Sequence, residues 1–106
     1  AWFRWDASGA VTVENDDTAA GHQTSKVATG VTFLANIWHI LRIDCTDIAS
    51  VKFYIDGDHV AAGTTFNMSQ VAALALQPVA RLDKAADVLN LGVMEVDYVR
   101  CWQKRS

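Results

Sequence analysis

The stretch "VKFYIDGDHVAAGTTFNMS", residues 51–69, predicts a β-hairpin. Apolar side chains recur at every second position of residues 51–55, which is the period of a strand with one buried face. Asp56 and Gly57 follow, and an Asp-Gly pair supplies the positive backbone φ that a tight primed turn requires. Residues 59–66 then return as the partner strand, so we predict two antiparallel strands joined by this turn.

Six other stretches with strand character surround this hairpin, and each shows alternation or a β-rich composition. They are residues 1–6, 10–14, 26–34, 37–45, 76–84 and 93–102. The clearest alternation is in "IWHILRIDC", residues 37–45. Residues 93–102 have apolar side chains on both faces, so we expect this strand to be central or covered on both sides.

The strand spacing is near the ~8–12 residues that are typical of β-sandwiches. We therefore predict an all-β fold, an antiparallel β-sandwich, with a single domain over residues 1–106. Residues 68–76 are the one segment with helical propensity, and we expect at most a short turn there because Pro78 closes it. Without a crossover helix, parallel strands are not expected.

The composition is that of an ordinary globular protein with a slightly acidic balance. Hydrophobic residues make up 51% and charged residues 20% of the 106 residues. Nine basic and twelve acidic residues give a net charge of −3, which argues against nucleic acid as a partner because phosphate binding requires a basic stripe. No apolar run has the length of a membrane span. The start at Ala1, without Met or a visible signal peptide, suggests a processed or partial chain.

The two cysteines, Cys45 and Cys101, have neither CxxC nor metal-site spacing. Each falls at an apolar position of an expected strand, where a free cysteine behaves as a small hydrophobic residue. We therefore expect two buried thiols. A Cys45–Cys101 disulfide stays open as an alternative if the two strands lie close together.

Three stretches, in this order along the chain, resemble sequence blocks of the concanavalin A-like lectin/glucanase superfamily. Residues 37–61, "IWHILRIDCTDIASVKFYIDGDHVA", are similar to its Trp-His to Phe-Tyr-Val-Asp-Gly block. Residues 76–84, "LQPVARLDK", resemble the next strand, which crosses the concave sheet. Residues 94–103, "MEVDYVRCWQ", resemble the strand that ends laminarinase-type members. The resemblance implies a jelly-roll β-sandwich.

The superfamily includes enzymes, lectins, adhesins and virion proteins, so the resemblance implies a fold more specifically than an activity. Its members usually carry several more strands before the position of Ala1. The chain then corresponds to a C-terminal portion of the fold, a short version of it, or a chain completed by another. Open sheet edges must be covered, so we expect other protein subunits as partners, in a homo-oligomer or a larger assembly.

The resemblance also raises the question of catalysis. The superfamily's glucanases use the pattern Glu-x-Asp-x-x-Glu, in which alternation directs the carboxylates into one cleft. This sequence lacks the pattern, and Glu95 and Asp97 come closest without a second Glu, so we predict no catalytic residues. The family has a structural calcium near the position of Asp97, and Asp16 and Asp17 could hold calcium only if further oxygens converge. Otherwise we expect no cofactor or metal.

Candidate binding residues come from an exposed strand face and from the presumed concave strand. Trp2 shares a face with Arg4, and an exposed aromatic beside hydrogen-bonding groups suits sugar stacking or a protein contact. Polar side chains would also project from residues 76–84. The predicted carbohydrate- or partner-binding residues are Trp2, Arg4, Gln77, Arg81 and Asp83.

The other aromatic residues and the histidines are expected to have structural roles. Trp5 shares a face with Phe3 and is expected in the core, and Trp38 and Trp102 lie in the family blocks. His39 alternates with apolar residues, so we expect a hydrogen-bonded, partly buried side chain rather than a ligand.

Two functional hypotheses of different class follow. The first is a non-enzymatic structural or binding module, a phage-like virion decoration, capsid or tail-associated protein with carbohydrate-binding ability, on a virion or outside the cell. It depends on the missing catalytic pattern, the small size and a similarity of residues 42–57 to phage structural proteins. The second is a fragment of a laminarinase-type glycoside hydrolase whose catalytic strand lies upstream of Ala1.

Overall fold

The computed structural model describes residues 1–71, 77–83 and 93–102. The chain divides into two units, Ala1–Leu74 and Ala75–Ser106, which are described separately below. The described residues form two three-stranded antiparallel sheets, both in the first unit. The expectation of an all-β antiparallel chain is therefore confirmed for the residues that the structure describes. No helix among these residues is long and apolar enough to cross a membrane.

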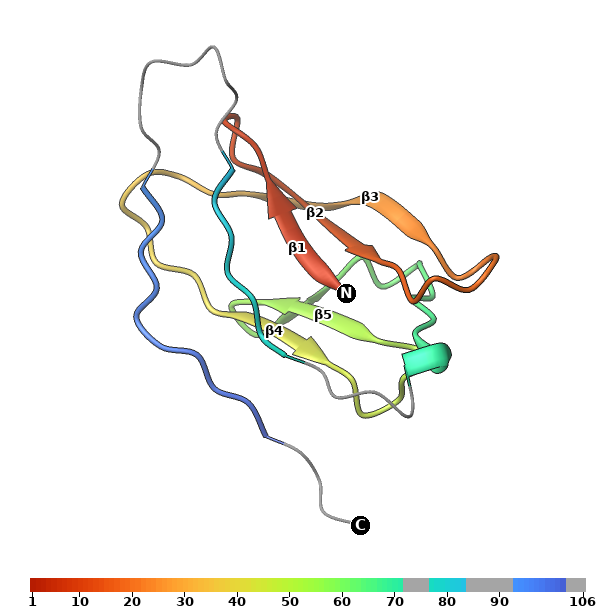
Figure 1. Cartoon of the computed structure of the whole chain (residues 1–106). Helices are drawn as coiled ribbons and strands as arrows, with labels where there is room; N and C mark the ends of the chain where they lie inside the picture. The colour runs from red at the N-terminus through yellow and green to blue at the C-terminus, as the bar shows by residue number, and fades with distance from the viewer. Residues whose placement is uncertain (72–76, 84–92, 103–106) are drawn as a thin grey trace. The chain divides into compact units, whose positions relative to one another are not determined.

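The first sheet has the strand order β1-β2-β3 (Figure 1). Its strands are β1 (Trp2–Trp5), β2 (Ala10–Asn15) and β3 (Thr24–Thr32). The turn between the first two strands depends on Gly9, whose φ is +79° and whose N–H donates to the Asp6 carbonyl at 2.9 Å. A Cβ at Gly9 would lie 2.1 Å from the backbone oxygen of Phe33, so only glycine fits this close approach.

The second sheet has the order β4-β5-β6. Its strands are β4 (Leu41–Asp44), β5 (Lys52–Ile55) and β6 (Asp58–Val60). Asp56 and Gly57 join the last two strands with φ angles of 52° and 92°, which are the two positive values of a type I′ turn. The predicted hairpin is therefore confirmed, although its second strand ends at Val60 rather than continuing to Phe66. Phe66 instead forms an isolated bridge with Val51.

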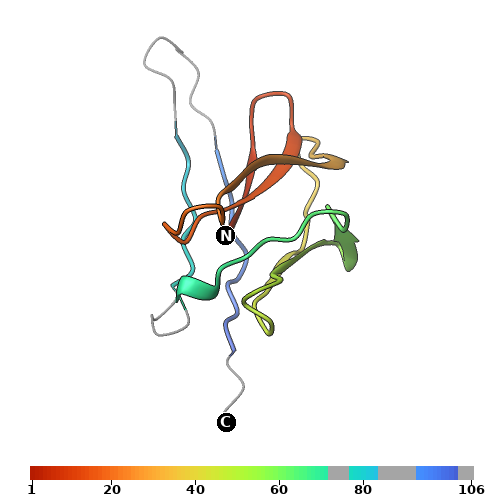
Figure 2. The same ribbon diagram turned by 90° about the vertical axis from the view of Figure 1, so that its right-hand side faces the viewer.

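The two sheets form two layers that share one core (Figures 1 and 2). Phe53 lies at its centre, with no exposed surface. Its ring packs edge-on against Phe3 of the first sheet, at 5.2 Å between ring centroids, and against Phe66 at 4.9 Å. The buried apolar residues are Val11, Val13, Val51, Phe53, Ile55, Val60, Phe66 and Met68. Alternation in β2 and β5 accounts for four of these eight, because every second side chain faces the opposite sheet.

The stretch with the clearest alternation forms less strand than expected. Only Leu41–Asp44 is paired, and Trp38 and Ile40 before it are exposed, Trp38 by 64%. The reason lies in Asp56, whose Oδ1 accepts the Ile40 N–H at 2.8 Å and whose N–H donates to the Ile40 carbonyl at 2.8 Å. These two bonds attach the Ile40 backbone to the hairpin turn, and regular pairing of β4 with β5 begins only at the next residue, Leu41.

Trp5 is also more exposed than expected. The prediction of a core position is wrong, because the indole packs edge-on against Phe33 at 5.3 Å between centroids and keeps an exposed side. η1 (Ser69–Val71) is a 3₁₀ turn, as expected for the start of residues 68–76; residues 72–76 lie outside the described residues.

In the second unit, the described residues 77–83 and 93–102 form no strand. Val79, Leu82 and Val99 are exposed, so the predictions of a core-facing strand and of a covered terminal strand are wrong for these residues. Alternation arranges side chains on two faces, but a strand also needs a neighbour for its backbone N–H and C=O groups.

The cysteine prediction is wrong as well. Cys45 is half-buried, Cys101 is exposed, and both are free thiols. Partial burial raises the pKa of the Cys45 thiol. Cys45 lies just beyond the end of β4 and packs against the core while remaining partly exposed.

Candidate functional site

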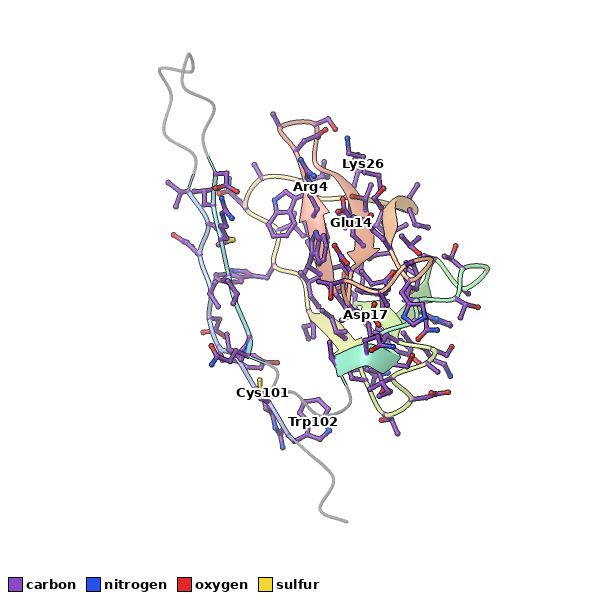
Figure 3. All side chains as sticks on the ribbon, turned by 45° about the vertical axis from the view of Figure 1, so that its right-hand side comes forward. Arg4, Glu14, Asp17, Lys26, Cys101 and Trp102 are labelled. Carbon is purple, nitrogen blue, oxygen red and sulfur yellow. The ribbon has the colours of Figure 1, made fainter. Side chains whose placement is uncertain are left out.

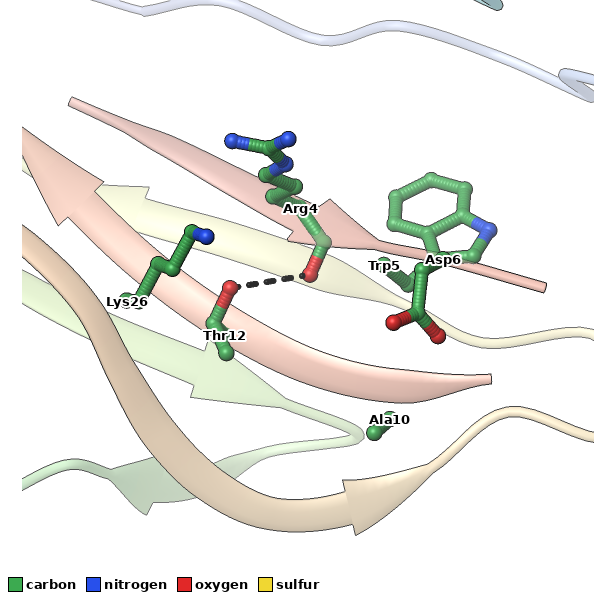
Figure 4. Close-up of a pocket in the computed structure, with 6 residues that line it drawn as sticks. All are labelled: Arg4, Trp5, Asp6, Ala10, Thr12 and Lys26. Carbon is green, nitrogen blue, oxygen red and sulfur yellow. Dashed lines mark hydrogen bonds between the residues drawn. The ribbon is translucent and has the colours of Figure 1, made fainter. Parts of the chain in front are cut away.

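A half-open pocket of about 170 Å³, with both polar and apolar lining, lies on the first sheet (Figure 4). It is called the outer-face pocket here, because Thr12 faces it from β2 while Val11 and Val13 face the core. Its lining residues are Arg4, Trp5, Asp6, Ala10, Thr12 and Lys26. They come from β1, the β1–β2 turn, β2 and β3, so the whole sheet builds the pocket.

The centre of the pocket is a cross-strand pair. Arg4 of β1 lies directly opposite Thr12 of β2 in the antiparallel register. Thr12 Oγ1 donates to the Arg4 carbonyl at 3.4 Å. Side chains of directly opposite residues stand on the same face of a sheet, so the pairing places the guanidinium and the hydroxyl together above the sheet.

Lys26 enters the pocket through an irregularity of β3. The β2–β3 register shifts between Val13 and Asn15, opposite the segment that contains Lys26. Lys26 has a φ of 52°, the left-handed value that a non-glycine residue adopts at a cost. A β-bulge re-aims the side chain that it carries. Figure 4 shows the result, with the Lys26 and Arg4 side chains rising from the same face on either side of Thr12.

The carboxylate of Asp6 lies at the other end of the pocket, beside Trp5 (Figure 4). Asp6 Oδ1 accepts the Ser8 hydroxyl at 2.6 Å and the Ser8 N–H at 2.8 Å. These bonds, the hydroxyl's first, hold the Asp6 pKa below its ordinary value. The group is therefore a carboxylate at neutral pH, and its Oδ1 is committed to the turn.

A buried carboxylate supports the pocket from one side. The side chain of Glu14 is only 7% exposed, and its Oε1 lies 3.7 Å from Arg4 Nη1 (Figure 3). Glu14 Oε1 has no hydrogen-bond partner among the described residues. The Arg4 side chain is 59% exposed, so it is held at one nitrogen and open to solvent elsewhere.

A second polar cluster lies where the β2–β3 loop meets the segment before η1. The Asp17 side chain is fully buried and accepts three hydrogen bonds, from His22 Nδ1 at 2.7 Å and from the N–H groups of Gln70 and Ala19 at 3.0 Å each. Burial opposes ionisation of Asp17, but the three hydrogen bonds outweigh it, so its pKa lies below the ordinary value.

Two asparagines complete this cluster. Asn15 Nδ2 donates to the carbonyls of His22 at 2.8 Å and Asn67 at 2.7 Å. Asn67 Nδ2 donates to His22 Nε2 at 3.3 Å, and Asn67 Oδ1 accepts the Ser69 N–H at 3.0 Å. Because Nε2 accepts, Nδ1 carries the proton that faces Asp17. The cluster joins segments about 50 positions apart in the sequence and has a structural role.

A third polar contact lies at the hairpin turn. His39 Nδ1 contacts Asp56 Oδ2 at 2.7 Å, and the imidazole stacks on Phe33 at 4.2 Å between centroids. The Ile40 N–H and then His39 hold the Asp56 pKa below its ordinary value. The expectation of a hydrogen-bonded, partly buried His39 is confirmed at Nδ1, whereas Nε2 is buried without a hydrogen-bond partner among the described residues.

The structure separates the predicted site residues. Arg4 lines the outer-face pocket, and Trp2 is exposed on the same strand without lining it. Gln77, Arg81 and Asp83 are exposed in the second unit, where Arg81 Nε donates to Asp83 Oδ1 at 2.8 Å. No strand presents these three residues together, because residues 77–83 are unpaired.

Five of the six lining residues were not predicted as site residues, and they differ in how strongly the sequence indicated their positions. Thr12 alternates with Val11 and Val13, which was a sufficient signal for an outward position. The direction of the Lys26 side chain depends on the bulge, and the glycine of residues 26–34, Gly30, lies four positions further along the chain and gives no sign of it.

Among the described residues, no three His, Cys, Asp or Glu side chains form a group that could hold a metal. The Asp16 and Asp17 carboxylates are instead bonded to the loop that they belong to. Asp16 accepts the Thr18 N–H at 2.7 Å, and Asp17 accepts the Ala19 N–H. Glu95 and Asp97 are exposed.

Comparison with known protein families, with curated proteins and with solved structures finds no match. The candidate site therefore rests on the pocket's own geometry. Its ingredients are two cations, a hydroxyl, an indole edge and a carboxylate, arranged across three strands of one sheet.

Proposed function

We propose that this protein is a non-enzymatic carbohydrate-binding module on a concanavalin A-like jelly-roll frame, and that it serves as a virion-associated structural or decoration protein. The observation that carries the binding part is the outer-face pocket, which brings the Arg4, Lys26 and Thr12 side chains together and is lined at one end by Asp6 and the partly exposed Trp5. Two antiparallel sheets with a shared core support the sandwich frame, and the three sequence blocks support the superfamily.

The chemistry of the pocket suits holding a ligand better than proton transfer. A general acid near neutral pH needs a raised carboxyl pKa. Asp6 has the opposite property, because its hydrogen bonds from Ser8 keep the carboxylate ionised. Arg4 and Thr12 are binding groups, with donors and lone pairs directed above the sheet.

The proposal includes assembly with further copies of this chain. Trp38 and Ile40 are exposed next to β4, which is the first strand in the order β4-β5-β6 of the described sheet. An edge strand with apolar neighbours favours pairing with another strand. Antiparallel self-pairing of β4, centred on Ile43, would place Arg42 opposite Asp44 of the second copy, which makes the pairing self-complementary.

A glycan array probed with the full chain tests the binding part. We expect selective retention on a subset of glycans, and loss of that retention in the Arg4→Ala and Thr12→Val variants. Lys52→Ala, an exposed position of the other sheet, is the matched control. Absence of binding to any glycan contradicts the proposal, and hydrolysis of a bound glycan favours the laminarinase-type alternative.

Light scattering tests the assembly part. We expect the wild-type chain to be oligomeric and Arg42→Asp to be monomeric, because like charges would then face each other across the pair. The double variant Arg42→Asp, Asp44→Arg restores opposite charges and should restore the oligomer. A wild-type monomer, or a charge swap that restores nothing, contradicts pairing through β4.

A further inference from the structure

We infer that the outer-face pocket selects an anionic saccharide, a sugar ring that carries a carboxylate or a sulfate group. This inference rests on the proposed carbohydrate binding and names its ligand class. It starts from the convergence of two cations, Arg4 and Lys26, from different strands on one small pocket (Figure 4).

Lys26 is the cation that lacks a counter-ion. Among the described residues it makes no ion pair, whereas Arg4 pairs with Glu14. The Lys26 backbone is held at a φ of 52° in a bulge, and strained, bulged positions are often found where a side chain is aimed for function. The bulge directs the Lys26 ammonium to the pocket, where an anionic ligand would supply the counter-ion that it lacks among the described residues.

Arg4 supplies the geometric selectivity. A guanidinium has five N–H donors in a planar fork that matches carboxylate and sulfate oxygens. Only Nη1 faces Glu14, at 3.7 Å, and the side chain is largely exposed. The buried Glu14 therefore steadies the guanidinium from one side, and the other donors stay available to a ligand.

The remaining lining groups favour a sugar over a bare anion. The pocket volume of about 170 Å³ is far above the ~10–15 Å³ that one water needs and below the ~300–1,000 Å³ of pockets for larger ligands. It is therefore suited to a single ring. Thr12 can accept a sugar hydroxyl, and the partly exposed Trp5 lines the end of the pocket next to Asp6.

The charges also orient the ligand. Arg4 and Lys26 lie at one end of the pocket and Asp6 at the other (Figure 4). Asp6 Oδ1 is occupied by Ser8, but Oδ2 can accept hydroxyl groups, which sugars supply and simple anions do not. An anionic sugar satisfies both ends when its acidic group faces the cations and its hydroxyls face Asp6.

Calorimetric titration of the full chain tests the inference with four probes. They are an oligouronate, a sulfated oligosaccharide, a neutral oligosaccharide of equal length, and inorganic sulfate. We expect one of the two anionic oligosaccharides to bind at least about tenfold more tightly than the neutral one, with weaker binding at higher salt. Which of the two binds distinguishes carboxylate from sulfate.

Lys26→Asn is the diagnostic variant, because asparagine tolerates a positive φ and removes the charge. We expect at least about a tenfold loss of affinity for the anionic saccharide and little change for the neutral one. Lys52→Gln should leave both affinities unchanged. If melting shows that Lys26→Asn does not fold, Arg4→Gln takes its place with the same expectation.

Four results would overturn the inference in distinguishable ways. Equal binding of neutral and anionic sugars removes the charge selectivity but leaves the proposed binding function intact. Equal losses in Lys26→Asn and Lys52→Gln indicate a general charge effect, and binding of inorganic sulfate as tight as that of the saccharide indicates a simple anion site. If no saccharide binds, the proposed function fails together with the inference.

Discussion

Residues 51–60 and residues 93–102 share a strand-like sequence pattern, yet they occupy opposite environments. In the first stretch Phe53 and Ile55 are buried between two sheets, and in the second Val99 is exposed. The first stretch contains its own turn, which supplies a backbone partner at once. The second has no paired neighbour among the described residues. Alternation thus determines which faces a strand would present, and pairing decides whether the strand forms.

The largest test of this comparison is Phe53→Ala. Phe53 has no exposed surface and contacts Phe3 and Phe66, so the substitution should lower the free energy of unfolding by about 3–5 kcal/mol. Tyr98→Ala is the counterpart in residues 93–102; its side chain is 64% exposed, so the loss should stay within about 0.5 kcal/mol. Urea unfolding measures the free energy of unfolding of both variants. Similar losses would contradict the view that only the first stretch contributes to the core.

The buried polar contacts extend the comparison. Asn15→Ala should cost about 1–3 kcal/mol, because it leaves the carbonyls of His22 and Asn67 without their buried donor. Arg81→Ala removes the exposed ion pair with Asp83 in the second unit, and a change above about 1 kcal/mol is not expected there. Equal effects in urea unfolding would mean that the Asn15 bonds add nothing beyond those of a surface pair.

The hairpin turn gives a smaller effect. Gly57→Val places a β-branched residue at a φ of 92°, which should cost about 1 kcal/mol or more. Nothing lies within 4 Å of the added Cβ, so the cost comes from the backbone conformation alone. Gly63→Val is the control, since it adds a side chain in open space without a positive φ. An unchanged melting temperature for Gly57→Val would contradict the turn.

The pH dependence of stability is the subtlest test. The folded pKa of Asp17 lies below its ordinary value of 3.8, so the unfolded chain binds more protons as the pH falls. The contribution of Asp17 to stability is therefore present above about pH 4 and is lost as the pH falls through the folded pKa. Unfolding midpoints between about pH 5 and pH 3 should fall less steeply in Asp17→Asn than in wild type. Parallel curves would show that Asp17 titrates as it does in the unfolded chain.

The sequence predicted local features better than it predicted sites. The Asp56-Gly57 turn was readable because two adjacent residues determine its backbone angles. Alternation with Val11 and Val13 would have indicated the outward position of Thr12, although no prediction was made for it, and Arg4 was singled out because it shares a face with Trp2. Thr12 alone carried no functional signal, because it becomes part of a site only together with Arg4 on β1 and Lys26 on β3.

The cluster around Asp17 could not be predicted in the same way. The sequence allowed calcium at Asp16 and Asp17 only if further oxygens converged, and the prediction was that no metal binds. The structure instead places Asn67 and Gln70 beside this loop, 45 and 53 positions away from their partners His22 and Asp17. Contacts at such separation depend on the packing of two sheets, which no short sequence window contains.

By itself, the sequence determined the all-β class, the hairpin at residues 51–60 and the side chains that residues 51–55 turn toward the core. These features follow from φ preferences and from a two-residue period, both of which act between neighbours. Only the tertiary structure decided the aim of Lys26, the burial of Asp17 and the exposure of Trp38. These depend on strand register and on which backbone groups meet, and such pairings form between segments that are distant along the chain.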